Sequence, residues 1–263
     1  MKPSQQYISK CREIIDLIEQ QYDQINQVAD WFSETILAGR MVHLFGSGHS
    51  RIMVEEMWPR YGSFPGFNPI VELSLTFHNN VTGTNGQRQA MYLENVSGFA
   101  KHILRNFDLS EIDSALVISS GGTNIVPIEI AQGFKKTGMK VVGMVGVRHL
   151  EASESKHPEN IKLTDTVDLV LDNGVPPGDS VVQIDDLDTP VSPGSTVGGV
   201  ALINAVKAEV ADRLTKAGQP PKVLTASCLV GSKRASHLFE SAYDEHAYRI
   251  SKLLSKEQGN LTE

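Results

Sequence analysis

The 263-residue chain has little cysteine: only Cys11 and Cys228 occur, far apart in the sequence. Neither belongs to a CxxC motif or to a cysteine and histidine spacing typical of zinc sites. Two separate thiols are typical of a protein in the reducing cytoplasm. The sequence therefore predicts no disulfide and no metal site, and it indicates no cofactor.

Basic residues are also scarce, with 24 Lys and Arg against 31 Asp and Glu, which gives a formal net charge of −7. No cluster of basic residues is interleaved with aromatics, so nucleic acid is a poor candidate for a partner. An acidic protein that binds phosphate must do so locally, through backbone amides and hydroxyl groups.

Long apolar runs are missing as well. No segment approaches the roughly 18 apolar residues of a membrane-spanning helix, and the first ten residues, MKPSQQYISK, have no apolar signal core. We therefore expect a cytoplasmic protein with no membrane partner.

What the chain does have is a strongly patterned amino-terminal segment. Apolar residues recur every three or four positions from Ile8 to Ile36, and Gly39 follows them. This spacing predicts one long helix of about 50 Å, with the heptad pattern that suits a partner helix. We therefore expect a homodimer or homotetramer, with packing on the chain's own sheet as the alternative.

Beyond this segment, short buried strands alternate with helices. Strands are expected at 41–45, 69–73, 114–119, 140–145 and 167–171, and helices at 50–61, 88–106, 125–137 and 197–216. The pattern predicts an α/β fold with a doubly wound, five-stranded parallel sheet, either flavodoxin-like or Rossmann-like, whose ligands lie at the carboxyl ends of the strands.

The carboxyl-terminal segment forms a separate unit in this interpretation. Residues 1–217 are expected to make one domain, and residues 218–263 an extension that starts near Pro220-Pro221 and contains a helix at 233–254. The extension is too short to bury enough surface alone, so we expect it to pack on the domain or on a neighbouring subunit.

A dinucleotide site is the first functional hypothesis for the stretch MVHLFGSGHSR. Gly46 and Gly48 follow a strand, and Glu72 ends the next one. However, Arg51 stands where the third glycine of GxGxxG is required, and its side chain would prevent the close packing of helix on strand. This hypothesis is therefore disfavoured.

Three turns rich in hydroxyl groups favour a sugar or phosphate site instead. They are Gly46–Ser50, the stretch 119–124 (SSGGTN) and the stretch 192–196 (SPGST). Each places free amides at the start of a helix, where Ser or Thr can cap the helix or bind an anion. Three such turns on one edge of a sheet favour a ligand.

These motifs resemble the sugar isomerase (SIS) domain family. The resemblance rests on LFGSGHS, ALVISSGGTNIVPIEIA, KVVGMVGVRHLEAS and DLVLDNGVPPGDS, and it is strongest to a little-characterised branch of phosphoheptose-isomerase-like proteins. It implies a dimerising domain that binds phosphosugars through serines of its first glycine loop and of an S-x-S-G-x-[ST] loop.

Carried over by position, the resemblance implies that the phosphate ligands are Ser47, Ser50, Ser119 and Thr123. In one register the second serine of the motif falls on Gly121, which removes a hydroxyl, while a shift of one residue restores it on Ser120. A sugar without phosphate, or one held by Arg51 or His49, stays open. The full set of candidate binding residues is Gly46, Ser47, Gly48, Ser50, Arg51, Ser119, Ser120, Gly121, Thr123, Asn124, Ser195 and Thr196.

Aldose–ketose isomerisation needs a positioned base and a proton donor. The stretch VEEMWPRYG resembles the E-E-L-x-x-R-Y segment of phosphoheptose isomerases, in which the second Glu is catalytic. It implies that Glu56 is the base, with Glu55 beside it. The alternative is a surface pair in which Glu56 binds Arg60 at i+4.

The partner histidine is not specified by the resemblance, because the helix at 197–216 that should carry it contains none. Asn204 and Lys207 are its inward polar candidates. The histidines that remain are His49, His78 and His246.

Two other acidic features occur in the sequence. Glu94, in MYLENVSGFA, falls where close relatives have an E-R pair, so its helix is expected to border the sugar. The run 185–188 (DDLD) lacks the glycine and the glutamate of a calcium loop and is expected to be solvated.

The sequence therefore predicts an enzyme, a sugar or sugar-phosphate isomerase that works through an enediol. The alternatives are a non-catalytic sugar-phosphate-binding SIS module and an amino-sugar etherase or lyase.

Overall fold

The computed structural model describes residues 1–76 and 86–254. Its centre is a parallel sheet with strand order β2-β1-β3-β4-β5. The strands are β1 (Val42–Gly46), β2 (Phe67–Ile70), β3 (Ser114–Ile118), β4 (Lys140–Val145) and β5 (Leu169–Asp172). The predicted doubly wound, five-stranded parallel sheet is thus confirmed.

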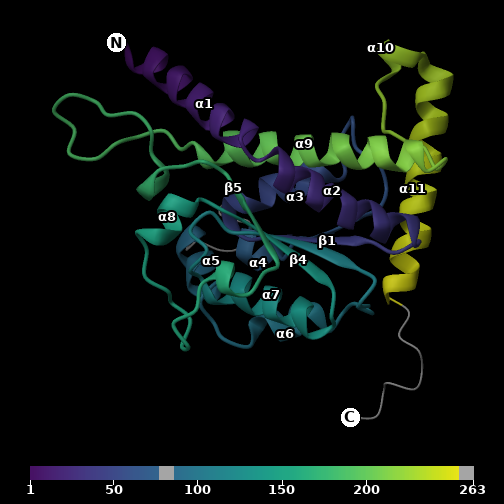
Figure 1. Cartoon of the computed structure of the whole chain (residues 1–263), viewed down its shortest axis with the longest axis horizontal. Coiled ribbons are helices and arrows are strands. Elements are labelled where there is room, and N and C mark those ends of the chain that lie inside the picture. The colour runs from purple at the N-terminus through teal and green to yellow at the C-terminus, as the bar shows by residue number, and fades with distance from the viewer. Residues whose placement is uncertain (77–85, 255–263) are drawn as a thin grey trace.

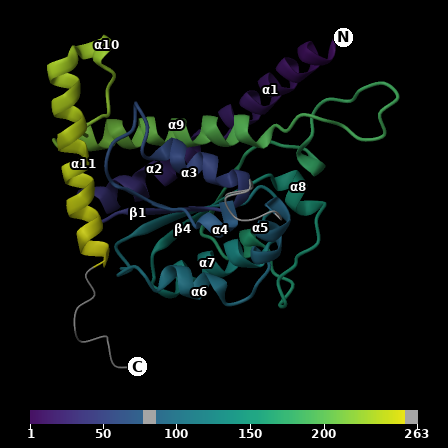
Figure 2. The same cartoon turned by 180° about the vertical axis from the view of Figure 1, so that it is seen from behind.

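Helices cover both faces of the sheet (Figure 1, Figure 2). On one face lie α1 (Pro3–Glu19), α2 (Tyr22–Leu37), α3 (Arg51–Met57) and α9 (Ser195–Lys216), and on the other α6 (Phe99–Leu104) and α7 (Ile125–Lys136). The remaining helices are α4 (Leu73–Thr76), α5 (Gln87–Leu93), α8 (Val147–Glu151), α10 (Ser227–Val230) and α11 (Ser232–Leu254). Each strand contributes side chains to both helical layers, because successive side chains point to opposite faces of the sheet. In β3, for example, Leu116 packs with α2 and α9, while Val117 packs with α7.

The prediction of a single long amino-terminal helix was wrong. The chain turns between α1 and α2, and the Gln21 side chain at the turn binds the end of β5. Its Nε2 donates to the Asp172 carbonyl and its Oε1 accepts from the Asp172 amide, both at 2.8 Å. This double contact fixes the turn. The alternative expectation, packing on the chain's own sheet, holds for α2, whose Val28 and Phe32 are fully buried.

Four other predicted elements also have different bounds in the structure. The helix expected at 50–61 ends at Met57. A proline disfavours helical backbone in the residue before it, and Trp58, which precedes Pro59, is extended. The helix expected at 88–106 is interrupted by Gly98, whose φ is +84°. The strands expected at 69–73 and 167–171 lie at Phe67–Ile70 and Leu169–Asp172.

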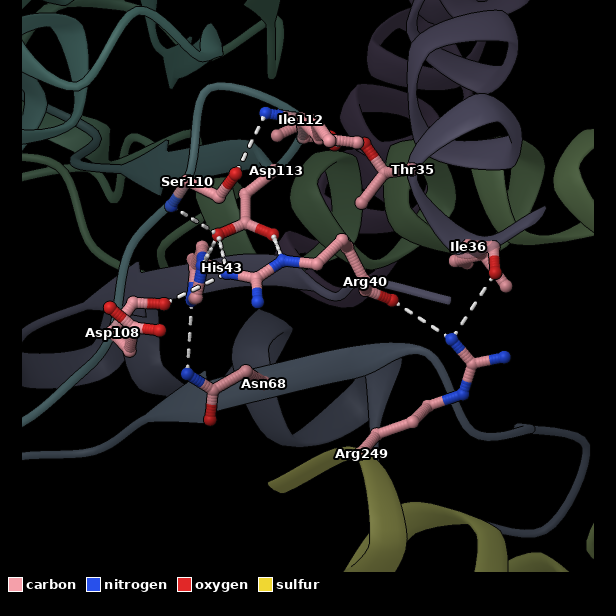
Figure 3. A network of polar contacts seen from close by, with 11 residues as sticks. Thr35, Ile36, Arg40, His43, Asn68, Asp108, Ser110, Ile112, Asp113 and Arg249 are labelled. Atoms are coloured by element: carbon pink, nitrogen blue, oxygen red, sulfur yellow. Dashed lines mark hydrogen bonds and ion pairs between the residues drawn. The ribbon is translucent and has the colours of Figure 1, made fainter. Parts of the chain in front are cut away.

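A buried polar network ties the amino end of the sheet together (Figure 3). Arg40 binds Asp113 with two hydrogen bonds of 2.7 and 2.8 Å. Asp113 also contacts Nε2 of the fully buried His43 at 3.1 Å, and Asn68 approaches the His43 Nδ1 at 3.0 Å. The network joins the end of α2 to β1, β2 and the start of β3.

The last helix, α11, docks at this same end. Arg249 donates to the carbonyls of Ile36 and Arg40, at 3.2 and 2.9 Å. As a result α11 stands at the opposite end of the molecule from α8 (Figure 1, Figure 2). In the part of the chain that the structure describes, no helix is both long enough and apolar enough to cross a membrane.

Candidate functional site

The carboxyl ends of β1 and β3 lie side by side, since Gly46 pairs with Ile118 in the sheet. From β1 the chain passes to α3 on one face of the sheet, and from β3 to α7 on the other. Such a switch point is the usual ligand position in doubly wound folds. The two glycine loops predicted from the sequence are the loops that meet here.

The first loop runs from Gly46 through a short 3-10 turn, Gly48–Ser50, into α3. A Cβ on Gly46 would lie 2.7 Å from the Ser50 carbonyl oxygen, so only glycine allows this tight return. Ser47 is buried, and Ser50 is half-buried. His49 is exposed at the rim of the loop.

The second loop runs from Ser119 to Asn124. Ser119 Oγ accepts from the Gly122 amide at 3.2 Å, which closes the loop. Within residues 1–76 and 86–254, the amides of Gly121, Thr123 and Asn124 donate to no protein group. Unpaired amides at the start of a helix suit an anion or a polar ligand atom, so this loop could bind one.

Glu94 links the two loops. The residue follows α5 and is buried, with 8% of its surface exposed. Its carboxylate is hydrogen-bonded to Ser47 of the first loop, and it accepts from Asn124 Nδ2 of the second at 2.6 Å. Its own carbonyl accepts from the Val126 amide at 2.9 Å. A carboxylate therefore occupies the point where the loops meet.

Burial raises the pKa of Glu94 above its ordinary value, although the hydrogen bond with Ser47, the charge of Lys156 and the Asn124 amide oppose the shift. Lys156 is exposed, and its Nζ donates to Asn124 Oδ1 at 2.8 Å. A carboxyl group with a raised pKa between two polar loops is a candidate for proton transfer.

Glu56, the base implied by the resemblance, lies elsewhere on α3. Its carboxylate binds Arg60 at 3.0 Å and accepts from Asn204 of α9 at 3.1 Å. Lys207, also on α9, donates to the Glu56 carbonyl at 2.8 Å. The i+4 pair with Arg60 that the sequence offered as an alternative is therefore present. Exposed Glu55 lies 3.8 Å from Arg51.

The third turn, which leads into α9, is occupied by a carboxylate of the chain itself. Asp179 Oδ1 accepts from the amides of Gly194 and Ser195 at 3.0 and 2.8 Å, and its Oδ2 accepts from Ser195 Oγ. A ligand would have to displace Asp179 from the Ser195 amide. The second predicted binding residue in this turn, after Ser195, is Thr196, which is half-buried.

Of the other predicted histidines, His246 lies away from the two glycine loops. His246, on α11, packs against Trp58 in a tilted arrangement with ring centroids 5.0 Å apart, at the end of α3 that points away from the glycine loops. Burial and the nearby Arg249 lower the pKa of His246. His78 lies outside the described residues.

Sequence reasoning missed three side chains near the second loop. Asn173 Nδ2 approaches Ser120 Oγ at 3.3 Å, His149 lies beside Gly121, and Lys156 reaches Asn124. Asn173 comes from the DNG motif that carried the resemblance, so its position after a strand was a usable signal. His149 and Lys156 follow β4 without a glycine and serine pattern to mark them.

Among the described residues, no group of three or more His, Cys, Asp or Glu side chains could hold a metal ion. The stretch 185–188 is exposed, as expected of a solvated loop.

The amino-acid sequence is similar to known proteins along nearly its whole length. The UPF0309 protein of Geobacillus kaustophilus is 30% identical over 241 residues, which cover 91% of this chain and 94% of that protein. A UPF0309 protein of Halalkalibacterium halodurans is 29% identical over 240 residues, again 91% of this chain and 94% of that protein.

Solved structures are similar at lower identity. A phosphoheptose isomerase from Francisella tularensis has a TM-score of 0.48 and 15% identity, covering 78% of this chain and 93% of that chain. The Vibrio vulnificus NanR protein, solved with ManNAc-6P, has a TM-score of 0.45 and 12% identity, covering 90% and 68%. The family profile of the SIS domain matches residues 6–146, which is more than half of the sequence. The chain therefore belongs to the SIS domain family.

Proposed function

We propose that this protein binds a small sugar phosphate between the β1 and β3 loops and transfers a proton on it through an enediol, as an aldose–ketose isomerase does. The observation that carries the proposal is Glu94. It is a buried carboxylate with a raised pKa that contacts both loops through Ser47 and Asn124.

The chemistry follows from this environment. Isomerisation removes a proton from the carbon beside a carbonyl and returns it to the neighbouring carbon, so one group must act as base and then as acid. A raised pKa brings a carboxyl group closer to neutral pH, where it can both accept and release a proton. The hydrogen bonds from Ser47 and Asn124 would hold the carboxylate in one orientation during both transfers.

In this proposal Glu94 takes the role that the resemblance implied for Glu56. The Glu56 carboxylate is neutralised by Arg60 and hydrogen-bonded to Asn204, contacts that favour a stable anion in a structural role. Glu56 remains the second candidate for the base, and the same experiment separates the two.

The experiment has two steps. First, thermal-shift measurements against C5 to C7 sugar phosphates and their unphosphorylated forms identify a stabilising ligand by mass action. Then solvent deuterium incorporation into that ligand is followed for the wild type, Glu94→Gln and Glu56→Gln.

We expect Glu94→Gln to bind the ligand but to lose exchange by at least about 100-fold, because an amide cannot accept the proton. Glu56→Gln should retain most of the exchange. Loss of exchange in Glu56→Gln alone would return the role of base to Glu56. Stabilising ligands without any exchange would identify a binding module rather than an enzyme.

We also propose that the protein is a homodimer or homotetramer that pairs through α1. The Ile8 and Ile15 side chains on this helix are 51% and 42% exposed. Residues 218–263 are proposed to act as an extension of the domain formed by residues 1–217. The contacts of Arg249 with the end of α2 support that assignment.

A further inference from the structure

Lys156 lies outside the two glycine loops and contacts the second one twice. Its backbone amide donates to the Thr123 carbonyl at 3.0 Å, and its Nζ donates to Asn124 Oδ1 at 2.8 Å. The proposed proton transfer gives this lysine no role. Yet only Asn124 separates it from Glu94 in a chain of hydrogen bonds.

This chain of hydrogen bonds runs from the surface to a buried carboxylate. Lys156 is exposed, whereas Glu94 has only 8% of its surface exposed. The Asn124 side chain stands between them, with its Oδ1 accepting from the lysine and its Nδ2 donating to Glu94 Oε2 at 2.6 Å. Lys156, Asn124 and Glu94 thus form a polar relay that ends at the proposed base.

The lysine determines which way round the Asn124 amide stands. An ammonium group only donates hydrogen bonds and an ionised carboxylate only accepts them, whereas an amide does both. In the observed orientation the amide oxygen faces Lys156 and the NH₂ group faces Glu94. The reverse orientation would lose both hydrogen bonds, so the charged groups at the two ends select the orientation that holds the carboxylate.

The backbone around Lys156 is fixed to the second loop independently of its side chain. The Lys156 amide donates to the Thr123 carbonyl at 3.0 Å. Further along the same segment, the Leu163 amide donates to the neighbouring Gly122 carbonyl at 2.8 Å. These backbone contacts remain when the lysine side chain is replaced, so a variant at this position should change the relay and leave the loop in place.

The charge of Lys156 acts on Glu94 in the opposite direction to burial. Burial disfavours the ionised carboxylate and raises its pKa, whereas a nearby cation favours the ionised form. Ser47 and Asn124 oppose the rise as well, through hydrogen bonds, and among these three groups of the described residues only the lysine is charged. A base must be deprotonated to act, so the opposing effect of the lysine matters for the proposed reaction.

We propose that Lys156 is a positioning residue for the proton transfer: it fixes the Asn124 amide against the Glu94 carboxylate, and its charge helps to keep that carboxylate ionised. This inference rests on the proposed function and adds to it a residue that need not touch the substrate. Because Lys156 is exposed, its effect is modest and is screened by salt.

The first experiment follows the ionisation of Glu94 in the free protein, by carbon-13 NMR titration of the glutamate carboxyl groups. The Glu94 resonance is the one that is missing from Glu94→Gln. Lys156→Met removes the charge and the donor but keeps a long side chain, whereas Lys156→Arg retains both. Lys136→Met, at an exposed position in the last turn of α7, is the matched control. Thermal unfolding checks that each variant is folded.

We expect Lys156→Met to raise the pKa of Glu94 above that in the wild type, because no cation then favours the ionised form at this position. Lys156→Arg and Lys136→Met should titrate as the wild type does. The difference between Lys156→Met and the wild type should shrink in about 1 M NaCl, where the screening length falls to about 3 Å. Identical titration of Glu94 in Lys156→Met and the wild type would overturn the inference.

The second experiment connects the relay to the reaction, with the C5 to C7 sugar phosphates of the binding screen as probes. On the acidic side of the pH profile, Lys156→Met should incorporate solvent deuterium about 2 to 5 times more slowly than the wild type, the range expected for one exposed charge interaction. Its profile should also move to higher pH, and Lys156→Arg should restore both the rate and the profile. A purely structural role of the lysine would not move the profile.

The two experiments separate this inference from the proposed function. If Glu94→Gln abolishes exchange while Lys156→Met keeps the rate and the pH profile of the wild type, Glu94 stays the base and the role of Lys156 is wrong. If exchange persists in Glu94→Gln, the proposed function fails, and the positioning role of Lys156 fails with it.

Discussion

At the residue scale, Glu94 and Asp113 are two buried carboxyl groups with opposite pKa shifts. Burial alone would raise the pKa of Asp113, but hydrogen bonds from His43 and Arg40 outweigh it and hold the value below the ordinary one. Glu94 forms no ion pair with any residue that the structure describes, so burial prevails and its pKa is raised. The contacts around each carboxyl group thus suit Asp113 to structure and Glu94 to proton transfer.

Asp113→Asn should destabilise the fold by about 3 kcal/mol at neutral pH, because it replaces a fully buried carboxylate that binds the half-buried Arg40 and leaves Arg40 without its counter-ion. Since the folded-state pKa of Asp113 is lowered, its contribution to stability is present above the unfolded value of 3.8 and is lost as the pH falls through the folded-state pKa. Urea unfolding should therefore show a smaller difference between variant and wild type at pH 3 than at pH 7. An equal difference at both values would contradict this account.

At the element scale, the sequence predicted the strands better than the helix boundaries. Buried apolar runs such as 114–118 and 140–145 leave few alternatives to a central strand. In contrast, the turn at Gln21 depends on Asp172, which lies 151 residues away, and no local pattern encodes it. Proline and glycine did mark two of the missed boundaries, at Pro59 and Gly98.

The candidate site shows the same division. The glycine loops could be located because their backbone geometry requires particular residues, as at Gly46. Side chains that reach the loops from other elements, such as Glu94 and His149, depend on how those elements pack. The resemblance implied Glu56 as the base, but it could not show that Arg60 and Asn204 contact its carboxylate.

The start of α9 offers a test of an element boundary. Asp179→Ala should destabilise the protein by about 1 to 2 kcal/mol, because it removes the acceptor for the Gly194 and Ser195 amides. Asp186→Ala is the matched control, since both aspartates have positive φ, 52° and 62°, and Asp186 lies in the exposed loop. Both variants place alanine at a position with positive φ. The difference between their thermal unfolding temperatures therefore measures the contribution of the hydrogen bonds from the Gly194 and Ser195 amides to Asp179.

Hydrogen exchange gives a second readout for this boundary. The Gly194 and Ser195 amides should exchange faster in Asp179→Ala than in Asp186→Ala. Equal protection of these amides in both variants would remove Asp179 from its role at α9.

At the scale of the whole molecule, α1 extends away from the sheet while α2 packs on it (Figure 1). Exposed apolar side chains on a projecting helix suit a second copy of the chain. The double variant Ile8→Glu/Ile15→Glu should therefore dissociate the oligomer in sedimentation velocity at micromolar concentration. Leu229→Glu, on α10, changes another exposed apolar residue and should not. A wild type that sediments as a monomer would contradict pairing through α1.

We propose above all that Glu94 transfers a proton on a sugar phosphate held between two loops at one edge of the sheet. The most direct test is the pH dependence of solvent deuterium incorporation into the stabilising ligand. Since the base must be deprotonated and its pKa is raised, the exchange rate should rise with pH through one ionisation above the ordinary glutamate value of about 4.3, and Glu94→Gln should abolish it. Exchange that persists in Glu94→Gln with an unchanged pH profile would contradict the account.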